Sequence, residues 1–191
     1  MGVAERKSRE RAEREQRIVA AARAIAEREG WEAVTVRRLA EEIEYSQPVL
    51  YSHFENRTAI VAAVAVEGFG EIAEVMRSAA NAASGTAEAV DAVARAYLDF
   101  ALGHPALYEA MFVLPTDLRF AEAETREELR SAFDAIAAVV APFCEDAEVA
   151  AETFWAALHG LAELERSGRI RVGARGERVA LVVQAVVGRA R

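Results

Sequence analysis

The segment between residues 31 and 57, WEAVTVRRLAEEIEYSQPVLYSHFENR, constrains the fold of this chain more than any other. Apolar residues recur in it at the i, i+3, i+4 and i+7 positions that form one buried stripe of a helix: Val36, Leu39, Ala40 and Ile43. Thr35 precedes them, and a threonine hydroxyl at that position can accept a hydrogen bond from an N–H of the first turn. The segment therefore predicts a short helix that begins after Thr35.

A second short helix is predicted immediately after Ser46. Ser46 can cap it, and Pro48 suits a first turn, where a missing N–H costs nothing. Leu50 and Phe54 then turn inward, while a polar and aromatic outer face remains: Gln47, Pro48, Tyr51 and His53. Two helices joined by a short turn, the second with such a face, form the helix-turn-helix pattern that reads a DNA major groove.

The stretch VTVRRLAEEIEYSQPVLYSHFENR resembles the DNA-binding segment of the TetR family of bacterial transcriptional regulators. In that family a Thr-x-x-x-(Leu/Ile)-Ala opening is followed by a turn and then by Leu-Tyr-x-(His/Tyr)-Phe-x-x-(Lys/Arg). The matching residues are Thr35, Leu39, Ala40, Ser46, Leu50, Tyr51, His53, Phe54 and Arg57. The family usually has Gly in the turn, where this chain has Glu44. If the backbone there is left-handed, Glu costs about 1 kcal/mol relative to Gly.

The resemblance implies an all-α fold, in which an N-terminal three-helix helix-turn-helix domain is joined by a long helix to a C-terminal helical ligand-binding and dimerisation domain. We place a charged N-terminal extension at residues 1–15, the DNA-binding domain at 16–62 and the ligand-binding and dimerisation domain at 63–191. The first helix should bury Ile18, Val19, Ala22, Ile25 and Ala26 and end at Gly30. Further helices are expected at 57–81, 86–102, 105–112, 118–140, 147–167 and 177–190.

The chemistry of the side chains divides the expected DNA contacts. Gln47 is the best candidate for a base edge, because its amide can bond adenine bidentately, and Pro48 offers an apolar surface to a thymine methyl. Tyr51 can reach a base or a phosphate, while His53 and Arg57 resemble the family's backbone-contacting positions. The full set of predicted DNA contacts is Thr35, Val36, Arg37, Ser46, Gln47, Pro48, Tyr51, His53 and Arg57. Tyr51 and His53 could instead be a surface pair without a ligand, and Arg38 is expected to be solvated or ion-paired.

The charge distribution is compatible with a DNA partner despite the net charge of −8. Residues 1–57 carry equal numbers of basic and acidic side chains, so the acidic excess lies in residues 58–191. Six basic residues gather near the start of the chain: Arg6, Lys7, Arg9, Arg11, Arg14 and Arg17. They could reach phosphates or a minor groove as basic arms do, or form a solvated helix with the interleaved Glu5, Glu10, Glu13 and Glu15.

Other classes of protein have little support in the sequence. The single Cys144 excludes an intrachain disulfide and suits a reducing cytoplasm. No apolar run approaches the eighteen residues of a membrane span, and residues 1–17 are too charged for a secretory signal. The three histidines, His53, His104 and His159, form no metal or nucleophile motif. We therefore predict no catalytic residue, no metal and no cofactor, although scattered residues of a helical enzyme could still meet in space.

Candidate ligand contacts after residue 62 are seven aromatic residues, two methionines and a histidine that could line an apolar pocket. They are Phe69, Met76, Tyr97, Phe100, Tyr108, Met111, Phe112, Phe133, Trp155 and His159, each of which could equally be plain core. The segment FWAALHG at 154–160 is similar to the Trp-His-Gly segment of one group of C-terminal domains in this family. His159 beside Gly160 could instead mark a close helix–helix contact.

The last two helices are the expected dimer elements. One stripe contains Val149, Phe154, Ala157, Leu158 and Leu161, and the other contains Val179, Val182, Val183, Val186 and Val187. They could also simply close the monomer's own core. The resemblance implies a cytoplasmic homodimer that represses from a palindromic DNA operator and is released by a small apolar or amphipathic ligand. The alternative is a helical small-molecule-binding dimer that no longer binds DNA.

Overall fold

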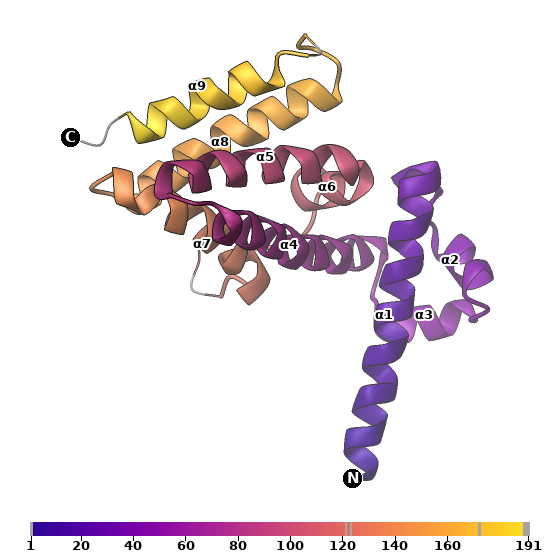
Figure 1. Cartoon of the computed structure of the whole chain (residues 1–191). Helices are drawn as coiled ribbons and strands as arrows, with labels where there is room; N and C mark the ends of the chain where they lie inside the picture. Colours follow the sequence, from indigo (N-terminus) through magenta and orange to yellow (C-terminus); the bar gives the residue numbers. More distant parts are fainter. Residues whose placement is uncertain (1, 121, 123, 172, 189–191) are drawn as a thin grey trace. The chain divides into compact units, whose positions relative to one another are not determined.

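The computed structural model describes residues 2–120, 122, 124–171 and 173–188, and within these ranges the chain is all-α, as predicted, with no strand (Figure 1). The N-terminal helices are α1 (Val3–Glu29), α2 (Val36–Glu42), α3 (Gln47–His53) and α4 (Arg57–Ala82). They are followed by α5 (Thr86–Gly103), α6 (Pro105–Phe112), α7 (Glu127–Val140), α8 (Ala147–Arg166) and α9 (Arg175–Val187). Short 3₁₀ turns lie at Trp31–Ala33 and Ala141–Phe143. None of the described helices is long and apolar enough to cross a membrane.

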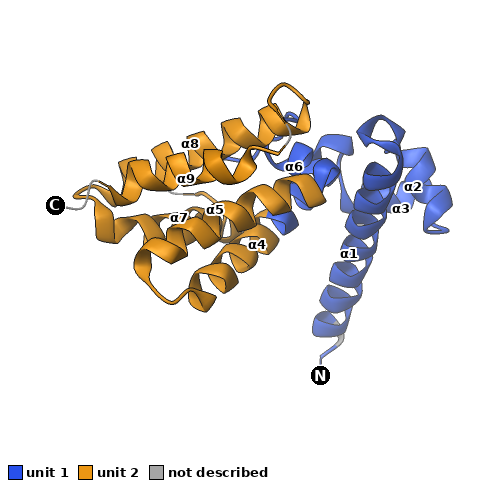
Figure 2. Cartoon of the chain, turned by 45° about the horizontal axis from the view of Figure 1, so that its top comes forward, with its two compact units in different colours: residues 1–68, 104–119 blue, residues 69–103, 120–191 orange. Residues whose placement is uncertain are grey.

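The helices form two compact units, which are coloured separately in Figure 2. Unit 1 contains residues 1–68 and 104–119, so it comprises α1, α2, α3, the first part of α4, and α6. Unit 2 contains residues 69–103 and 120–191. Helix α6 therefore belongs to the unit of the helix-turn-helix, although α5 before it and α7 after it belong to the other. The domain boundary after residue 62 stays a prediction.

The core of unit 1 is built from the apolar stripes that the sequence shows. All five predicted core residues of α1 are buried: Ile18, Val19, Ala22, Ile25 and Ala26. Leu39 and Ala40 of α2, Leu50 of α3, and Ile60 and Val64 of α4 are buried too. Each of these helices thus turns one apolar face inward, and its remaining surface is left for solvent or a partner. We call α1, α2, α3 and the start of α4 the head.

In unit 2, α5 packs against α7, α8 and α9. Its buried residues include Val90, Val93, Ala94, Tyr97 and Leu98, and Phe154 and Leu158 of α8 and Val179 of α9 are buried as well. Phe69 meets Phe120 edge to face, with ring centroids 5.6 Å apart.

Two predicted helices differ from the structure at their ends. The helix expected at 118–140 begins only at Glu127, and residues 121 and 123 lie outside the described residues. Before it, the buried Thr125 holds a non-helical loop, because its hydroxyl accepts from Glu122 N (3.0 Å) and its carbonyl accepts from the Arg130 guanidinium (2.6 Å). The helix expected at 177–190 begins two residues earlier, at Arg175, and residues 189 and 190 lie outside the described residues.

Candidate nucleic-acid interface

Helix α2 is fixed at its start by the predicted cap. The Thr35 hydroxyl accepts a hydrogen bond from Arg38 N at 3.1 Å. Leu39 and Ala40 are buried, whereas the Arg37 side chain is 80% exposed and lies 3.9 Å from the Glu41 carboxylate. Arg38 is ion-paired to Glu29 (3.2 Å) and Glu42 (3.4 Å), in agreement with the role expected for it. Arg37 is therefore the more exposed arginine of α2, and its contact with DNA stays a prediction.

The turn between α2 and α3 requires a left-handed residue, and Glu44 supplies it with φ 56°. Among the described residues it is the only non-glycine with positive φ. The next residue, Tyr45, closes the turn, because its N–H donates to Ala40 O at 3.0 Å. Its ring lies under the Arg17 guanidinium, 5.7 Å from the ring centroid. The left-handed backbone considered for Glu44 from the sequence is thus present, and the contacts of Tyr45 hold the turn in place.

Glu44→Gly is therefore expected to stabilise the protein by about 1 kcal/mol, because glycine adopts the left-handed conformation without steric cost. Urea unfolding monitored by circular dichroism measures the difference. Glu41→Gly is the matched control: it places glycine inside α2, in right-handed backbone, and should lower stability by about 1 kcal/mol. Equal changes for both variants would show that the turn is not strained.

Helix α3 presents the face expected of a reading helix. Gln47, Pro48 and Tyr51 are exposed, Tyr51 to 55%, while Leu50 between them is buried and anchors the helix. Ser46 occupies the N-cap position, but its side chain makes no cap hydrogen bond, contrary to expectation. The reason is local: Val49 N, which the hydroxyl would have accepted from, donates to Ser46 O at 3.0 Å instead, and Pro48 has no N–H.

His53 does not lie on the outer face, and this part of the prediction is wrong. Its side chain is only 5% exposed, and Nδ1 lies 3.2 Å from a carboxylate oxygen of Glu15 on α1. His53 follows Tyr51 by two residues, or about 200° around a helix, so the two side chains point to opposite sides. His53 joins α3 to α1, and its contact with a DNA phosphate stays a prediction.

Arg57 also serves the fold, in a way the sequence did not suggest. Its guanidinium donates to Val34 O (3.0 Å) and to Trp31 O (2.6 Å), two carbonyls at the 3₁₀ turn before α2. Asn56 beside it caps the start of α4, because Asn56 Oδ1 accepts a hydrogen bond from Ala59 N at 2.9 Å. Arg57 therefore ties the start of α4 to the start of the helix-turn-helix, and a phosphate contact stays a prediction for this side chain.

Helix α6 is attached to α1 within unit 1. The buried Trp31 indole donates to Ala106 O at 2.7 Å. The Glu27 carboxylate accepts from Ala106 N (3.3 Å) and Leu107 N (3.0 Å), so it caps the first turn of α6. A Cβ at Gly68 of α4 would lie 2.6 Å from Met111 Sδ and 2.8 Å from a Leu107 methyl carbon, so this glycine permits close packing of α4 on α6. The end of α1, the middle of α4 and α6 form one packed group.

The predicted ligand contacts fall in both units. Tyr108, Met111 and Phe112 lie on α6 in unit 1, and the rings of Tyr108 and Phe112 pack 4.7 Å apart. The other seven lie in unit 2: Phe69, Met76, Tyr97, Phe100, Phe133, Trp155 and His159. Most of the ten are buried, and Phe112, Phe133, Trp155 and His159 are half-buried.

Three of the unit 2 candidates are brought together by α5 and α8. The Trp155 indole donates to the Tyr97 hydroxyl at 3.1 Å, and the Trp155 and His159 rings lie 6.4 Å apart. Burial lowers the pKa of the His159 imidazole below its ordinary value, so this ring is held neutral at pH 7. Tyr97 is buried in this cluster, and Trp155 and His159 are half-buried. Their contact with a ligand stays a prediction.

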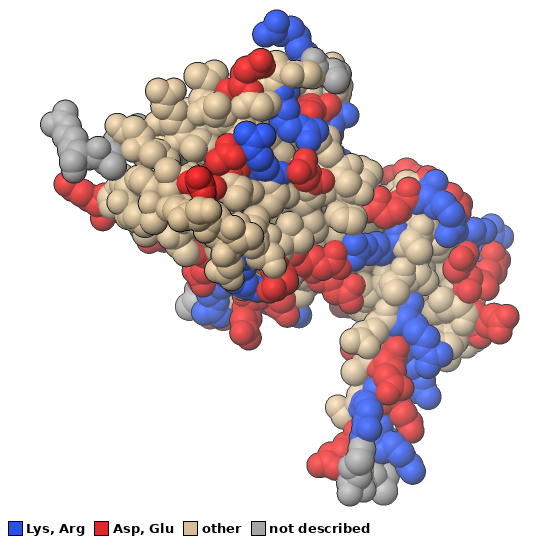
Figure 3. Space-filling view, in the orientation of Figure 1, with Lys and Arg blue, Asp and Glu red and all other residues tan. Residues whose placement is uncertain are grey.

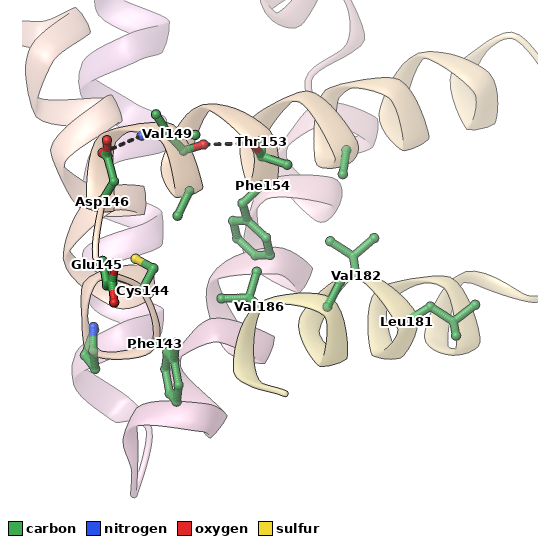
Figure 4. Close-up of a pocket in the computed structure, with 14 residues that line it drawn as sticks. Phe143, Cys144, Glu145, Asp146, Val149, Thr153, Phe154, Leu181, Val182 and Val186 are labelled. Carbon is green, nitrogen blue, oxygen red and sulfur yellow. Dashed lines mark hydrogen bonds between the residues drawn. The ribbon is translucent and has the colours of Figure 1, made fainter. Parts of the chain in front are cut away.

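A groove with a volume of about 820 Å³ opens between α8, α9 and the loop before α8 (Figure 4). None of the ten predicted ligand contacts lines it. Its walls include Phe143, Cys144, Val149, Phe154, Leu181, Val182 and Val186. Of the predicted dimer stripes, Phe154, Leu158 and Val179 are buried in the chain's own core, while Val149 is 56% exposed. Leu181, which sequence reasoning missed, is 68% exposed.

Comparisons with known proteins agree with this geometry. Residues 18–64 match the family described as "Bacterial regulatory proteins, tetR family", and residues 90–188 match "Tetracyclin repressor-like, C-terminal domain". An uncharacterized HTH-type transcriptional regulator of Mycobacterium tuberculosis is 32% identical over 154 residues, which cover 79% of this chain and 69% of that protein.

Solved structures show the same fold. A protein with unknown function from Rhodococcus sp. RHA1 has a TM-score of 0.75 at 26% identity, with 93% of this chain and 95% of that chain covered. The transcriptional regulator FadR from Bacillus subtilis, in complex with stearoyl-CoA, has a TM-score of 0.64 at 15% identity, with 92% and 99% covered.

The head has three complete helices, and α3, the second helix of its helix-turn-helix, has an exposed polar face. With the family match over residues 18–64, this arrangement defines a DNA-binding transcriptional regulator of the helix-turn-helix class. The chain belongs to the TetR family of such regulators, because the matched C-terminal family segment spans more than half of it and the matched N-terminal segment contains the whole helix-turn-helix.

Proposed function

We propose that this protein is a homodimeric repressor that binds a palindromic operator through α3 and leaves it when a small apolar or amphipathic molecule binds. The observation that carries the DNA half of the proposal is the exposed face of α3, with Gln47, Pro48 and Tyr51 held outward by the buried Leu50. With Thr35, Val36, Arg37 and Ser46 at the starts of the two helices, this face makes up the proposed reading surface.

Within this surface Gln47 is the proposed reader of a base. Gln47→Ala should lower affinity for the operator by about 1–3 kcal/mol and leave affinity for random duplex unchanged, because only a base contact carries sequence information. Fluorescence anisotropy against the DNA upstream of the chain's own gene, with a shuffled duplex beside it, measures both. Arg37→Ala is the control: the loss of a surface cation should weaken binding to both duplexes alike. A Gln47→Ala loss that is equal on both duplexes would remove Gln47 from base reading.

The second half of the proposal concerns the ligand. The Tyr97–Trp155–His159 cluster supports an apolar or amphipathic molecule with one polar group, because it offers ring surfaces beside a hydroxyl and an imidazole. The FadR neighbour, solved with stearoyl-CoA, is a protein of this fold that accommodates an amphipathic molecule. Thermal-shift screening with compounds of this kind, followed by anisotropy on the operator, tests whether a stabilising compound also lowers DNA affinity.

Helix α6 carries three of the predicted ligand contacts and belongs to the same compact unit as the helix-turn-helix. Within this unit it is held to α1 by Trp31 and Glu27 and to α4 at Gly68. A ligand releases the protein from DNA only if it binds the DNA-free conformation better than the DNA-bound one, because only a difference in affinity moves the equilibrium.

The homodimer is proposed to form through α8 and α9. Val149 and Leu181 line the groove on these helices and are large apolar side chains left exposed in the single chain. A second copy related by a twofold axis would cover both, since an isologous interface uses the same surface twice. Two heads would then reach half-sites about 34–36 Å apart.

A further inference from the structure

The N-terminal part of α1 is an unbroken helix that the core of unit 1 does not require. Helix α1 begins at Val3, but its first buried side chain is Ile18. Residues 4–14 are all exposed, and this stretch runs on past α3 in the two views of Figures 1 and 2. Ion pairs one turn apart support the helix there, Arg6 with Glu10 (3.7 Å) and Arg11 with Glu15 (2.9 Å). A helix maintained without burial is presented to solvent or to a partner.

Two contacts fix this stretch to the reading helix. The Arg11 guanidinium donates to Ser52 O of α3 at 3.4 Å, and Glu15 bonds the buried His53 ring at 3.2 Å. Both contacts are to the C-terminal end of α3, and residues 4–14 continue the same helix whose later residues are buried in unit 1. The stretch therefore has a defined position beside α3, and so beside a duplex that α3 binds.

The charges on the stretch alternate in sequence and in Figure 3, but they are not equivalent. Arg6 and Arg11 are neutralised by their ion pairs, and Arg17 lies over the Tyr45 ring. Lys7 and Arg14 make no hydrogen bond or ion pair with any of the described residues. They are also spaced with Arg11 at i, i+4 and i+7, so all three share the helix face from which Arg11 reaches α3. The uncompensated positive charge thus lies on the side of the reading helix.

We propose that the stretch from residue 4 to residue 17, the N-terminal arm, is a second DNA-contacting surface, in which Lys7 and Arg14 bind phosphates beside the site read by α3. Lys7 and Arg14 are two helical turns apart, about 10 Å along the axis, or about three base-pair steps of one strand. Two cations at that spacing can each bind one phosphate of the same strand, with two phosphates between them. The proposal rests on DNA reading by α3, and it adds affinity without sequence preference, because phosphates carry no base information.

The test compares two double variants by the salt dependence of DNA binding. Lys7→Gln with Arg14→Gln should make the slope of log affinity against log salt shallower by about two for each subunit bound, on the upstream duplex and on a random duplex alike. At about 100 mM salt it should weaken binding by roughly tenfold or more per subunit. The matched control is Arg6→Gln with Arg9→Gln, which removes the same charge from the N-terminal arm but from positions about 100° and 160° away from Lys7 around the helix axis. The control should leave the slope within experimental error of wild type.

The outcomes separate this proposal from the function on which it rests. If wild type shows no preference for the upstream duplex over random DNA, sequence reading by α3 is contradicted, whatever the two double variants do. If wild type shows that preference but the two double variants change the slope equally, or neither changes it, the N-terminal arm does not contact DNA. Circular dichroism of both variants shows whether α1 stays helical, and hydroxyl-radical footprinting of wild type should show protected sugars beside the α3 site that disappear in Lys7→Gln/Arg14→Gln.

Discussion

Leu181→Asp is expected to convert the protein to a monomer at micromolar concentration and to abolish operator binding. Leu181 is 68% exposed on the wall of the α8–α9 groove, so a dimer formed there buries it twice. Burying a leucine contributes about 1.5–3 kcal/mol, so losing two copies costs about 3–6 kcal/mol of dimer stability before the desolvation of two carboxylates is counted. The dimer dissociation constant should rise by a factor of about 100 or more.

Sedimentation velocity over a concentration series measures this change. Val113→Asp is the control, because Val113 is also an exposed apolar residue, at 52%, but lies in unit 1 and does not line the groove. Circular dichroism should show both variants folded, since neither side chain is part of the core. A Leu181→Asp protein that stays dimeric would place the interface elsewhere.

Arg57→Ala is expected to lower the unfolding free energy of the protein, and not only its affinity for DNA. The two carbonyls that the guanidinium satisfies belong to Trp31 and Val34, which are both buried. Trp31 O keeps a second donor in Val34 N (3.1 Å), so the variant leaves only Val34 O without a partner among the described residues. A buried group left without its partner costs about 1–3 kcal/mol, and the variant should lose about that much unfolding free energy. Arg57→Lys should recover only part of the loss, because an ammonium group does not reproduce the fork of the guanidinium.

Urea unfolding measures the effect, with Arg37→Ala as a control that removes an exposed arginine and should leave stability within about 0.5 kcal/mol of wild type. The alternative, a role only at DNA, makes the opposite forecast: Arg57→Ala would then unfold like wild type and bind every duplex more weakly.

The local features of the head were predictable because each depends on a few neighbouring residues. The Thr35 cap, the left-handed backbone at Glu44 and the exposure of Gln47 and Tyr51 follow from helix spacing and turn chemistry within a dozen residues. The partners of His53 and Arg57 lie 38 and 23 residues away in the sequence, so no local pattern could show that both side chains turn toward the protein.

In the C-terminal half of the chain, too, features that depend on particular tertiary contacts could not be predicted from local sequence patterns. Composition and breaks predicted its helices, but not that Thr125 would hold residues before Glu127 in a loop, because that depends on two hydrogen bonds made by one buried residue. The apolar stripes predicted for the dimer included Val149 but not Leu181. Helical spacing selects apolar residues that are buried together, and it does not show which other apolar residue remains exposed to solvent. The placement of α6 in unit 1 depends on Trp31 and Glu27, about 75 to 80 positions earlier in the chain.

That placement has a practical consequence for protein engineering. A hybrid regulator made by grafting only residues 1–62 onto a foreign sensor would leave the Trp31 indole without its acceptor and the Glu27 carboxylate without the amides it caps. It would also omit the Leu107 and Met111 side chains that pack at Gly68. The transferable piece is discontinuous: it must carry residues 104–119 as well, so swapping sensors in this protein means exchanging two segments of the gene around a retained insert.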